Sequence, residues 1–294
     1  MRELSQDYGP VVRDERFPDV SKLLWISEQA FQKCSQHVDA APEKYASREG
    51  NVITILMHHA YNVSYSVRLL TTYVQLLEAH ALLRTRLEQV IKCSYLLHVD
   101  PKDGLIPFMQ DVGRVDHAMS QYVRRQDSDL YDLMIKIFPD KIEEARERAV
   151  EQEKQIDPDF DPEAGKIKEG WTDLNTYDMA KKRDGMISDD DPITGNKLQW
   201  YYLTLYKSAC KFIHSGAACL TKNFITVRDT NRGLEVGPQI TYLFTNLLQV
   251  AHLDILQCYE VMKYFGAEKE AETLVSLHEQ YKEIVPLEAV LDMG

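Results

Sequence analysis

The sequence has few glycines, few cysteines and no long apolar run. Its 13 glycines are scattered through 294 residues, and none falls in GxxxxGK[ST] or GxGxxG, the patterns that hold phosphates. The nucleophile elbow GxSxG is also absent. No apolar run approaches the roughly 20 residues that span a bilayer, and the N-terminus is charged where a signal peptide is apolar. These absences exclude the familiar phosphate-binding loops and predict a cytoplasmic protein with no membrane association.

Cysteine and histidine patterns that hold metals are missing as well. The five cysteines are Cys34, Cys93, Cys210, Cys219 and Cys258. They form no CxxC pair, and four lie in apolar helical patterns, which indicates reduced and buried thiols. Neither HExxH nor ExxH occurs. The sequence therefore predicts no metal site and no cofactor.

Basic residues are outnumbered by acidic ones. The 46 Asp and Glu against 34 Lys and Arg give a formal net charge of -12. This balance repels a phosphate backbone, so bulk nucleic-acid binding is not expected. What the chain does have is 44% hydrophobic residues, which is enough for a substantial core.

The hydrophobic residues recur with the 3.6-residue period of a helix almost throughout. This periodicity predicts an all-α fold, a multi-helix bundle with long irregular excursions around residues 156–197. The expected organisation has three parts. Residues 1–50 hold an N-terminal helix and link, residues 51–225 a helical core, and residues 226–294 a C-terminal helical pair that packs on the core. The core includes a charged arm near 127–155 and the polar excursion at 156–197.

Breaker residues predict where the helices end. The helices are expected at about 20–37, 51–98, 106–125, 127–155, 172–183, 198–224, 238–265 and 267–284. Pro139 interrupts the fourth of these, and Gly266 separates the last two. Residues 51–98 contain neither proline nor glycine, so they form one very long helix or two joined near 74–79. Typical helix lengths favour two.

Arg84 and Glu88 form the first candidate for chemistry. In EAHALLRTRLEQV they stand four residues apart and share one helical face. On a surface, such a pair contributes on the order of 0.5 kcal/mol. If the face is buried, the pair needs further partners, and Tyr206 or His214 from another helix could supply them. Both interpretations stay open.

The stretch LYKSACKFIHSGAACL is the second candidate. Tyr206, Cys210 and His214 climb one side of the expected helix, and the small residues around His214 admit a close helix or leave a hollow. A hydrogen-bonded histidine in a core would give the same pattern. Cys210 is either a buried inert thiol or one activated by a nearby cation.

Three stretches together resemble a bacterial all-helical family described only as a domain of unknown function, number 5677. They are RTRLEQVIKCSYLL, with its Arg-x-x-x-Glu pattern, GWTDLNTYDMAKK, and the segment that carries Tyr206, Cys210 and His214. The family's pattern in the last segment is Tyr-x-x-x-Ser-x-x-x-His, so Cys210 replaces a serine. The resemblance covers roughly residues 50–225.

The resemblance implies that five residues gather in one place. These are Arg84, Glu88, Trp171, Tyr206 and His214. The family is similar in architecture to abortive-infection proteins and, more distantly, to HEPN helical domains, many of which cut RNA. Their signature of Arg followed by four to six residues and then His is absent here, which disfavours an ordinary HEPN ribonuclease.

Three functions remain open, and whether the protein is an enzyme is left undecided. One is a sensor or interaction protein in antiphage or stress defence, which binds a protein partner or a small anionic ligand. Another is an RNA- or nucleotide-directed hydrolase. There His214 is the general acid or base, Arg84 holds an anionic oxygen, Glu88 fixes Arg84, and Tyr206 donates a hydrogen bond. The third is a structural helical scaffold.

Two further expectations concern contacts. Trp171 and Cys210 are predicted to line the binding site. The C-terminal helices carry apolar residues on more than one face, so a homodimer through them is expected, although a crowded monomer core would explain the same pattern.

Overall fold

The protein is helical, which confirms the all-α prediction. The computed structural model describes residues 8–15, 17–100, 104–109, 117, 120–125, 128–156, 158–162, 172–193, 197–207, 209–210, 226–227, 234–235 and 241–284. Within them, strand occurs only in β1 (Thr226–Val227) and β2 (Leu234–Glu235). The two strands are antiparallel, with Thr226 opposite Glu235.

The chain divides into two compact units. Unit 1 comprises residues 1–98 and 176–294, and unit 2 comprises residues 99–175. The helices of unit 1 are η1 (Pro10–Arg13), α1 (Val20–Ala40), α2 (Pro42–Tyr45), α3 (Arg48–Thr72), α4 (Leu76–His98), α9 (Thr176–Asp184), α10 (Leu198–Tyr201), η2 (Tyr202–Tyr206), α13 (Thr241–Tyr264) and α14 (Glu268–Ile284). Those of unit 2 include α5 (Leu105–Met109), α7 (Ser128–Ile137) and α8 (Pro139–Ile156).

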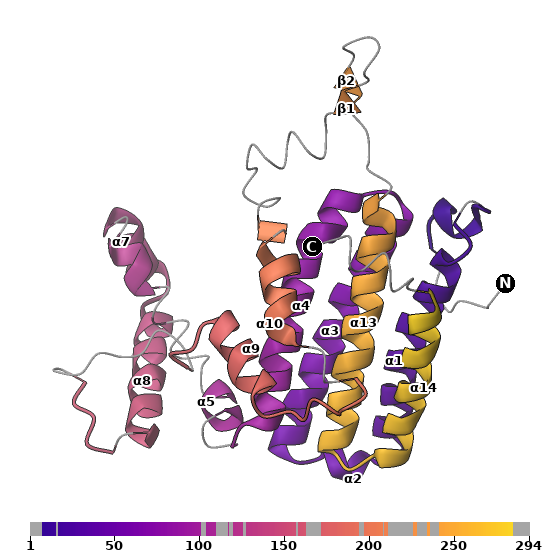
Figure 1. Cartoon of the computed structure of the whole chain (residues 1–294). Helices are drawn as coiled ribbons and strands as arrows, with labels where there is room; N and C mark the ends of the chain where they lie inside the picture. Colours follow the sequence, from indigo (N-terminus) through magenta and orange to yellow (C-terminus); the bar gives the residue numbers. More distant parts are fainter. Residues whose placement is uncertain are drawn as a thin grey trace. The chain divides into compact units, whose positions relative to one another are not determined.

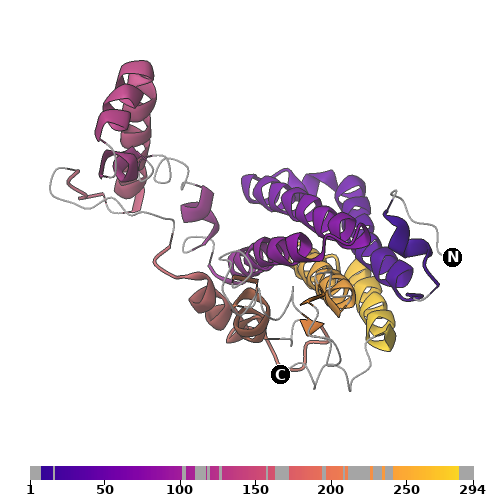
Figure 2. The same cartoon turned by 90° about the horizontal axis from the view of Figure 1, so that it is seen from above.

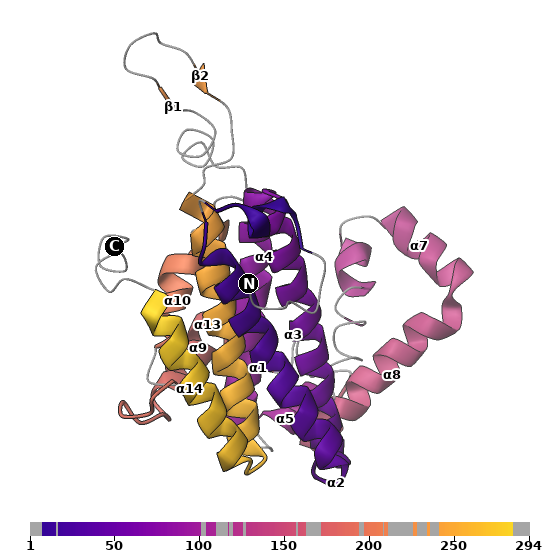
Figure 3. The same ribbon diagram turned by 90° about the vertical axis from the view of Figure 1, so that its right-hand side faces the viewer.

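Helix α13 is the central element of unit 1. It packs against α1, α3, α4 and α14 (Figures 1 and 3). Figure 2 shows the same bundle from above. Residues 250–262 of α13 are all buried, because neighbouring helices cover the helix on every side. The apolar residues on several faces of α13 therefore form part of the core of unit 1.

Two helices, α3 and α4, occupy the long stretch without proline or glycine, which confirms that interpretation. The break lies at residues 73–75, where Val74 has φ of 63°. A β-branched residue rarely adopts this left-handed conformation, so no local signal marks the turn. The turn is held by backbone hydrogen bonds, such as the one from the Gln75 nitrogen to the Leu70 oxygen at 2.8 Å.

The expected link between the first two helices is wrong in detail, because most of it is helical. Helix α1 continues to Ala40, α2 follows it, and α3 begins at Arg48 instead of near residue 51. The Ser47 hydroxyl caps α3 by accepting a hydrogen bond from the Gly50 nitrogen at 2.9 Å. Gly50 does not break the helix. A Cβ there would lie 2.8 Å from the Tyr45 Cα, so the glycine permits close packing on α2.

Two other breaks match the prediction. Helix α7 ends at Ile137 and α8 begins at Pro139, and Gly266, with φ of 68°, separates α13 from α14. Of the helix expected at 106–125, the described residues include α5 and the helical segment 120–125. Beyond Cys210, the helix expected at 198–224 lies outside the described residues.

A buried ionic cluster joins three helices of the bundle. Asp254 of α13 accepts hydrogen bonds from Arg86 Nε of α4 at 3.1 Å and from the Ser64 hydroxyl of α3 at 2.5 Å. Arg68 Nη1 of α3 lies 3.4 Å from the same carboxylate. All three charged side chains are fully buried. Losing one partner would leave an uncompensated buried charge, so the cluster favours this one arrangement of helices.

Cys34, Cys93 and Cys258 are buried free thiols, as predicted, whereas Cys210 is half-buried. Cys219 lies outside the described residues. Within the described part of the chain, no helix has the length and apolar character required to cross a bilayer.

Candidate functional site

Arg84 is held in a fixed orientation at the surface of α4. Its Nε donates to Glu88 Oε1 at 3.2 Å, one helical turn away, and its Nη2 donates to the Tyr206 hydroxyl at 3.0 Å. The guanidinium carbon also lies 4.8 Å from the centre of the Tyr206 ring. The Arg84 and Glu88 side chains are 27% and 26% exposed. The pair is therefore neither a free surface pair nor a sealed one.

Tyr206 reaches Arg84 from η2, a π-helical turn that follows α10 directly. Its ring stacks on that of Tyr202, with centroids 4.4 Å apart and planes 14° apart. These two tyrosines are four positions apart, so they share one side of the π-turn, as they would in an α-helix. Single π-turns occur frequently at functional sites.

The tyrosines of this cluster are protonated at neutral pH. Burial raises the pKa of Tyr206 to about 12, and the neighbouring Glu88 carboxylate adds to the increase. Burial also raises the pKa of Tyr202, with further contributions from Cys210 and Glu88. Both hydroxyls can therefore donate hydrogen bonds.

The structure thus joins three of the six predicted site residues by direct contacts: Arg84, Glu88 and Tyr206. Cys210 follows Tyr206 by four positions and is half-buried. The roles of all four residues in binding or catalysis stay predictions. Trp171 and His214 lie outside the described residues. No described group of three or more His, Cys, Asp or Glu side chains is arranged to hold a metal ion.

A second polar network holds the segment that leads into Tyr206. The Asp184 carboxylate at the end of α9 accepts hydrogen bonds from the Leu198 nitrogen at 3.0 Å and the Gln199 nitrogen at 2.9 Å. These are the first two backbone nitrogens of α10. Asp184 therefore caps the helix that continues into η2, and it does so from 14 positions earlier in the chain.

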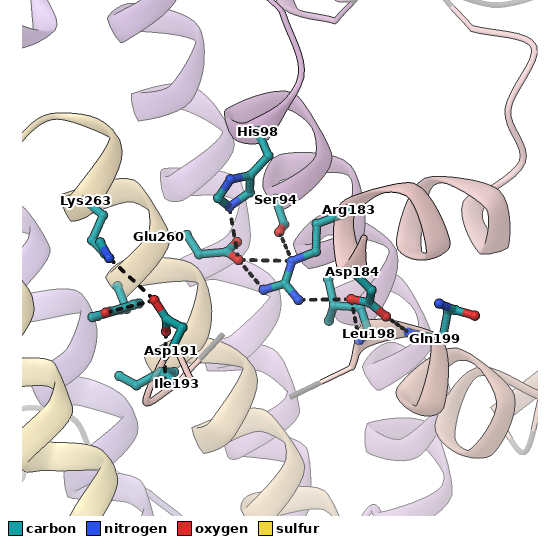
Figure 4. A network of polar contacts seen from close by, with 11 residues as sticks. Ser94, His98, Arg183, Asp184, Asp191, Ile193, Leu198, Gln199, Glu260 and Lys263 are labelled. Atoms are coloured by element: carbon teal, nitrogen blue, oxygen red, sulfur yellow. Dashed lines mark hydrogen bonds and ion pairs between the residues drawn. The ribbon is translucent and has the colours of Figure 1, made fainter. Parts of the chain in front are cut away.

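Arg183 connects this cap to the bundle core. Figure 4 shows its side chain between Glu260 and Asp184. Arg183 Nη1 donates to Asp184 at 3.0 Å, Nε donates to the Ser94 hydroxyl at 2.8 Å, and Nη2 donates to Glu260. His98 Nε2 lies 3.5 Å from the same Glu260 oxygen. Helices α4, α9 and α13 are thereby joined at one guanidinium.

The electrostatics of the network keep Glu260 charged despite its burial. Burial alone would raise the pKa of Glu260. The Arg183 guanidinium and the neighbouring His98 and Ser94 outweigh this effect, so the pKa is lowered. A buried carboxylate that stays ionised holds Arg183 strongly, and Arg183 in turn orients Asp184.

A smaller clamp fixes the loop between α9 and α10. Asp191 Oδ2 accepts hydrogen bonds from Tyr259 at 3.3 Å and Lys263 at 3.4 Å, both on α13. Its Oδ1 accepts one from the Ile193 nitrogen at 3.2 Å. Figure 4 shows this clamp beside the Arg183 network. The loop that precedes α10 and η2 is therefore anchored to the core through the carboxylates of Asp184 and Asp191.

Arg183, Asp184 and Glu260 were not among the site residues predicted from the sequence. A usable signal existed for Glu260, because it is the one acidic residue in the largely apolar stretch ILQCYEVM, and a buried carboxylate must be paired. The sequence carries no comparable signal for Arg183 and Asp184, because they end a short, highly charged helix whose pattern is typical of a solvent-exposed helix.

The profile of one protein family, described as a family of unknown function (DUF5677), matches residues 50–232. These residues include Arg84, Glu88, the Asp184 cap and Tyr206. No curated protein and no solved structure matches the chain.

Proposed function

Because the chain belongs to the DUF5677 family, whose function is unknown, we propose a function from the site alone. The protein is a sensor or interaction module that binds a small anionic ligand at Arg84. Glu88 and Tyr206 orient the guanidinium, and the tyrosines of η2 offer it an aromatic neighbour. The setting we propose is antiphage or stress defence.

One observation carries this proposal: the Arg84 guanidinium is held in one orientation but still has a hydrogen-bond donor that no residue in the described part of the chain occupies. Its Nε and Nη2 are engaged by Glu88 and Tyr206, whereas Nη1 has no hydrogen-bond partner among the described residues. About a quarter of the side chain remains exposed. A planar guanidinium held in this way can donate to a phosphate or carboxylate oxygen without first losing side-chain freedom.

The charge of the site indicates what kind of anion suits it. Glu88 balances much of the charge of Arg84, so a bare ion such as inorganic phosphate gains little from Coulomb attraction. Aromatic groups add stacking, which contributes about 1–3 kcal/mol per base in nucleic-acid sites. An oxyanion that carries an aromatic ring, such as a nucleotide, therefore fits the proposal better than a simple anion.

Isothermal titration of the intact chain with AMP, adenosine and inorganic phosphate tests this proposal. AMP is expected to bind more tightly than either fragment. Arg84→Gln is expected to lower the affinity for AMP at least about tenfold, the loss typical of one charge-assisted hydrogen bond. Tyr206→Phe, which keeps the ring, should weaken it about threefold by releasing the guanidinium.

Arg148→Gln is the matched control. Arg148 is likewise an arginine four residues from a glutamate, with Nη2 3.9 Å from Glu144 Oε2, but it is more exposed, and its guanidinium lies over no aromatic ring among the described residues. Binding should not change in this variant. Equal losses in Arg84→Gln and Arg148→Gln would contradict the proposal, as would equal affinity for AMP and phosphate. Conversion of AMP to products, followed by chromatography, would favour the hydrolase interpretation with His214 instead.

A further inference from the structure

A groove runs along the bundle between α1 and α3, away from the Arg84 cluster. Both helices pack on α13. The groove has a volume of about 960 Å³ and is lined by residues of α1, α2, α3 and α13. This volume lies at the upper end of the range of about 300–1,000 Å³ typical of small-molecule sites.

The groove has an apolar and aromatic lining with a polar rim. Its apolar members include Phe31, Ile53, Met57, Tyr61 and Val261. Phe31 of α1 and Tyr61 of α3 meet edge to face, with centroids 5.3 Å apart, and so join the two walls. Glutamines of α1, together with Thr54 and His58 of α3, supply the polar rim. The groove would therefore suit a ligand with an apolar body.

Charge decides which apolar ligands fit. Among the described residues that line the groove, none is lysine or arginine, so an anion would be desolvated there without a counter-ion. Its one acidic residue, Glu28, is 93% buried and accepts a hydrogen bond from the Tyr8 hydroxyl at 2.9 Å.

Glu28 also has little charge left over for a cation. Across the neighbouring core, the buried carboxylates of Glu28 and Asp254 match the two buried guanidiniums of Arg68 and Arg86. Arg68 lies over the Tyr61 ring, 5.7 Å from its centroid. An uncharged ligand therefore suits the groove best.

One buried polar atom at the groove lacks a partner. Tyr45 of α2 is only 4% exposed, and its hydroxyl makes no hydrogen bond among the described residues. The ring is packed against Phe265, with centroids 4.2 Å apart, and against His37 at 5.9 Å, so the hydroxyl cannot easily turn to solvent. A buried and unpaired hydroxyl costs free energy that a ligand atom could recover.

We propose that the α1–α3 groove binds an uncharged amphipathic organic molecule. Its apolar body lies on the aromatic and aliphatic lining, and one of its oxygens accepts a hydrogen bond from the Tyr45 hydroxyl. This site is separate from Arg84 and does not depend on the function proposed above.

Nile red is the probe, because it is uncharged, has a carbonyl acceptor and fluoresces strongly in apolar surroundings. Titration of the intact chain should show saturable binding of one dye per chain. Ser35→Trp, at an exposed lining position, should weaken binding at least about tenfold by filling the groove. Tyr45→Phe should weaken it about fivefold, the value of one hydrogen bond, and shift the emission to shorter wavelength.

Two comparisons make the test specific. Ile55→Ser is the matched control, since Ile55 is 67% exposed on α3 but does not line the groove. The affinity of this variant for Nile red should stay within about twofold of that of the unchanged protein. As competitors, 1-octanol should displace the dye and octanoate should not. Circular dichroism establishes that each variant is folded.

Several outcomes would overturn the proposal. They are an absence of saturable binding to the folded chain, equal displacement by octanol and octanoate, and an equal loss in Ile55→Ser and Ser35→Trp. An unchanged affinity in Tyr45→Phe would overturn the role assigned to that hydroxyl.

Discussion

Two arginines of the same helical turn of α4 have opposite environments. Arg84 is 27% exposed and bonds to Glu88 and Tyr206, whereas Arg86 is fully buried and bonds to Asp254. Neighbouring positions on a helix point about 100° apart, so two positions separate the side chains by roughly 200°. In RTRLEQV, the i,i+4 spacing identifies Arg84–Glu88 as a pair. It carries no information about Asp254, which lies on another helix.

Also at the residue scale, two buried histidines should make the folded protein less stable in acid. His252 and His278 are buried and stack with Tyr201 and Tyr281, close to Lys282 and Glu279. Burial, with smaller contributions from His278 and Lys282, lowers the pKa of His252 from 6.5 to about 3. Burial and Lys282 lower the pKa of His278 to about 4.

The direction of the pH effect follows from proton uptake by the unfolded chain. Above about pH 6.5 both states keep these histidines neutral, so the free energy of unfolding is at its full value. Between about pH 6.5 and 4 only the unfolded chain binds the protons. The free energy of unfolding then falls by up to about 1.4 kcal/mol per pH unit for each histidine.

Urea unfolding of the intact protein at several pH values between about 5 and 7.5 measures this slope. His252→Phe should reduce the slope by roughly half, because one of the two groups is gone. His58→Gln, at an exposed position, should leave it unchanged. An unaltered slope in His252→Phe would show that other groups cause the acid sensitivity.

At the scale of elements, the position of Tyr206 depends on how α10 begins. Helix α10 has four residues and its own N-cap residue, Lys197, provides no side-chain hydrogen bond. The cap comes from Asp184, which Arg183 holds against the core. Short helices have little intrinsic stability, so this long-range cap decides where η2 and its tyrosines lie.

Replacing Asp184 tests this dependence. Asp184→Ala leaves two backbone nitrogens of α10 without acceptors and should lower the free energy of unfolding by about 1–3 kcal/mol. Hydrogen exchange at Leu198 and Gln199 should accelerate, and AMP affinity should fall. Asp189→Ala, which removes an exposed ion pair with Lys197, is the control and should change none of these three quantities. Unchanged exchange in Asp184→Ala would contradict the capping role.

At the scale of the whole molecule, α7 carries more exposed large apolar side chains than any other helix that the structure describes. The whole of α7 has no buried residue, and Leu133, Ile137 and the adjoining Phe138 are 49%, 54% and 53% exposed. By contrast, the apolar residues of α13 that suggested a homodimer are covered by helices of the same chain. A homodimer through the C-terminal helices stays a prediction. Exposed apolar groups of the α7 kind commonly mark contact surfaces.

Light scattering coupled to size-exclusion chromatography distinguishes association through α7 from a homodimer through the C-terminal helices. We expect the intact chain to show a mass above 34.0 kDa that rises with concentration, because apolar side chains of α7 associate. Leu133→Glu with Ile137→Glu should return the mass to that of one chain. Ile55→Glu, at another exposed apolar position, should not. Association that persists in the α7 variant would point to the C-terminal helices instead.

The helical elements of this protein were predictable because their signals are local. Period, Pro139 and Gly266 placed most helix boundaries within a few residues, and i,i+4 spacing paired Arg84 with Glu88. The Val74 turn was harder to place because it depends on a left-handed residue without glycine. The approach of Tyr206 to Arg84 was expected from the family resemblance and not from spacing.

What only the tertiary structure decided is which helical faces meet. Arg183 lies 77 positions from Glu260, and Arg86 lies 168 positions from Asp254. A periodic pattern shows that a face is apolar, but it does not name the helix that covers it, because many packings bury similar area. The buried charges select among those packings, since each charge is stable only where its partner lies within hydrogen-bonding distance.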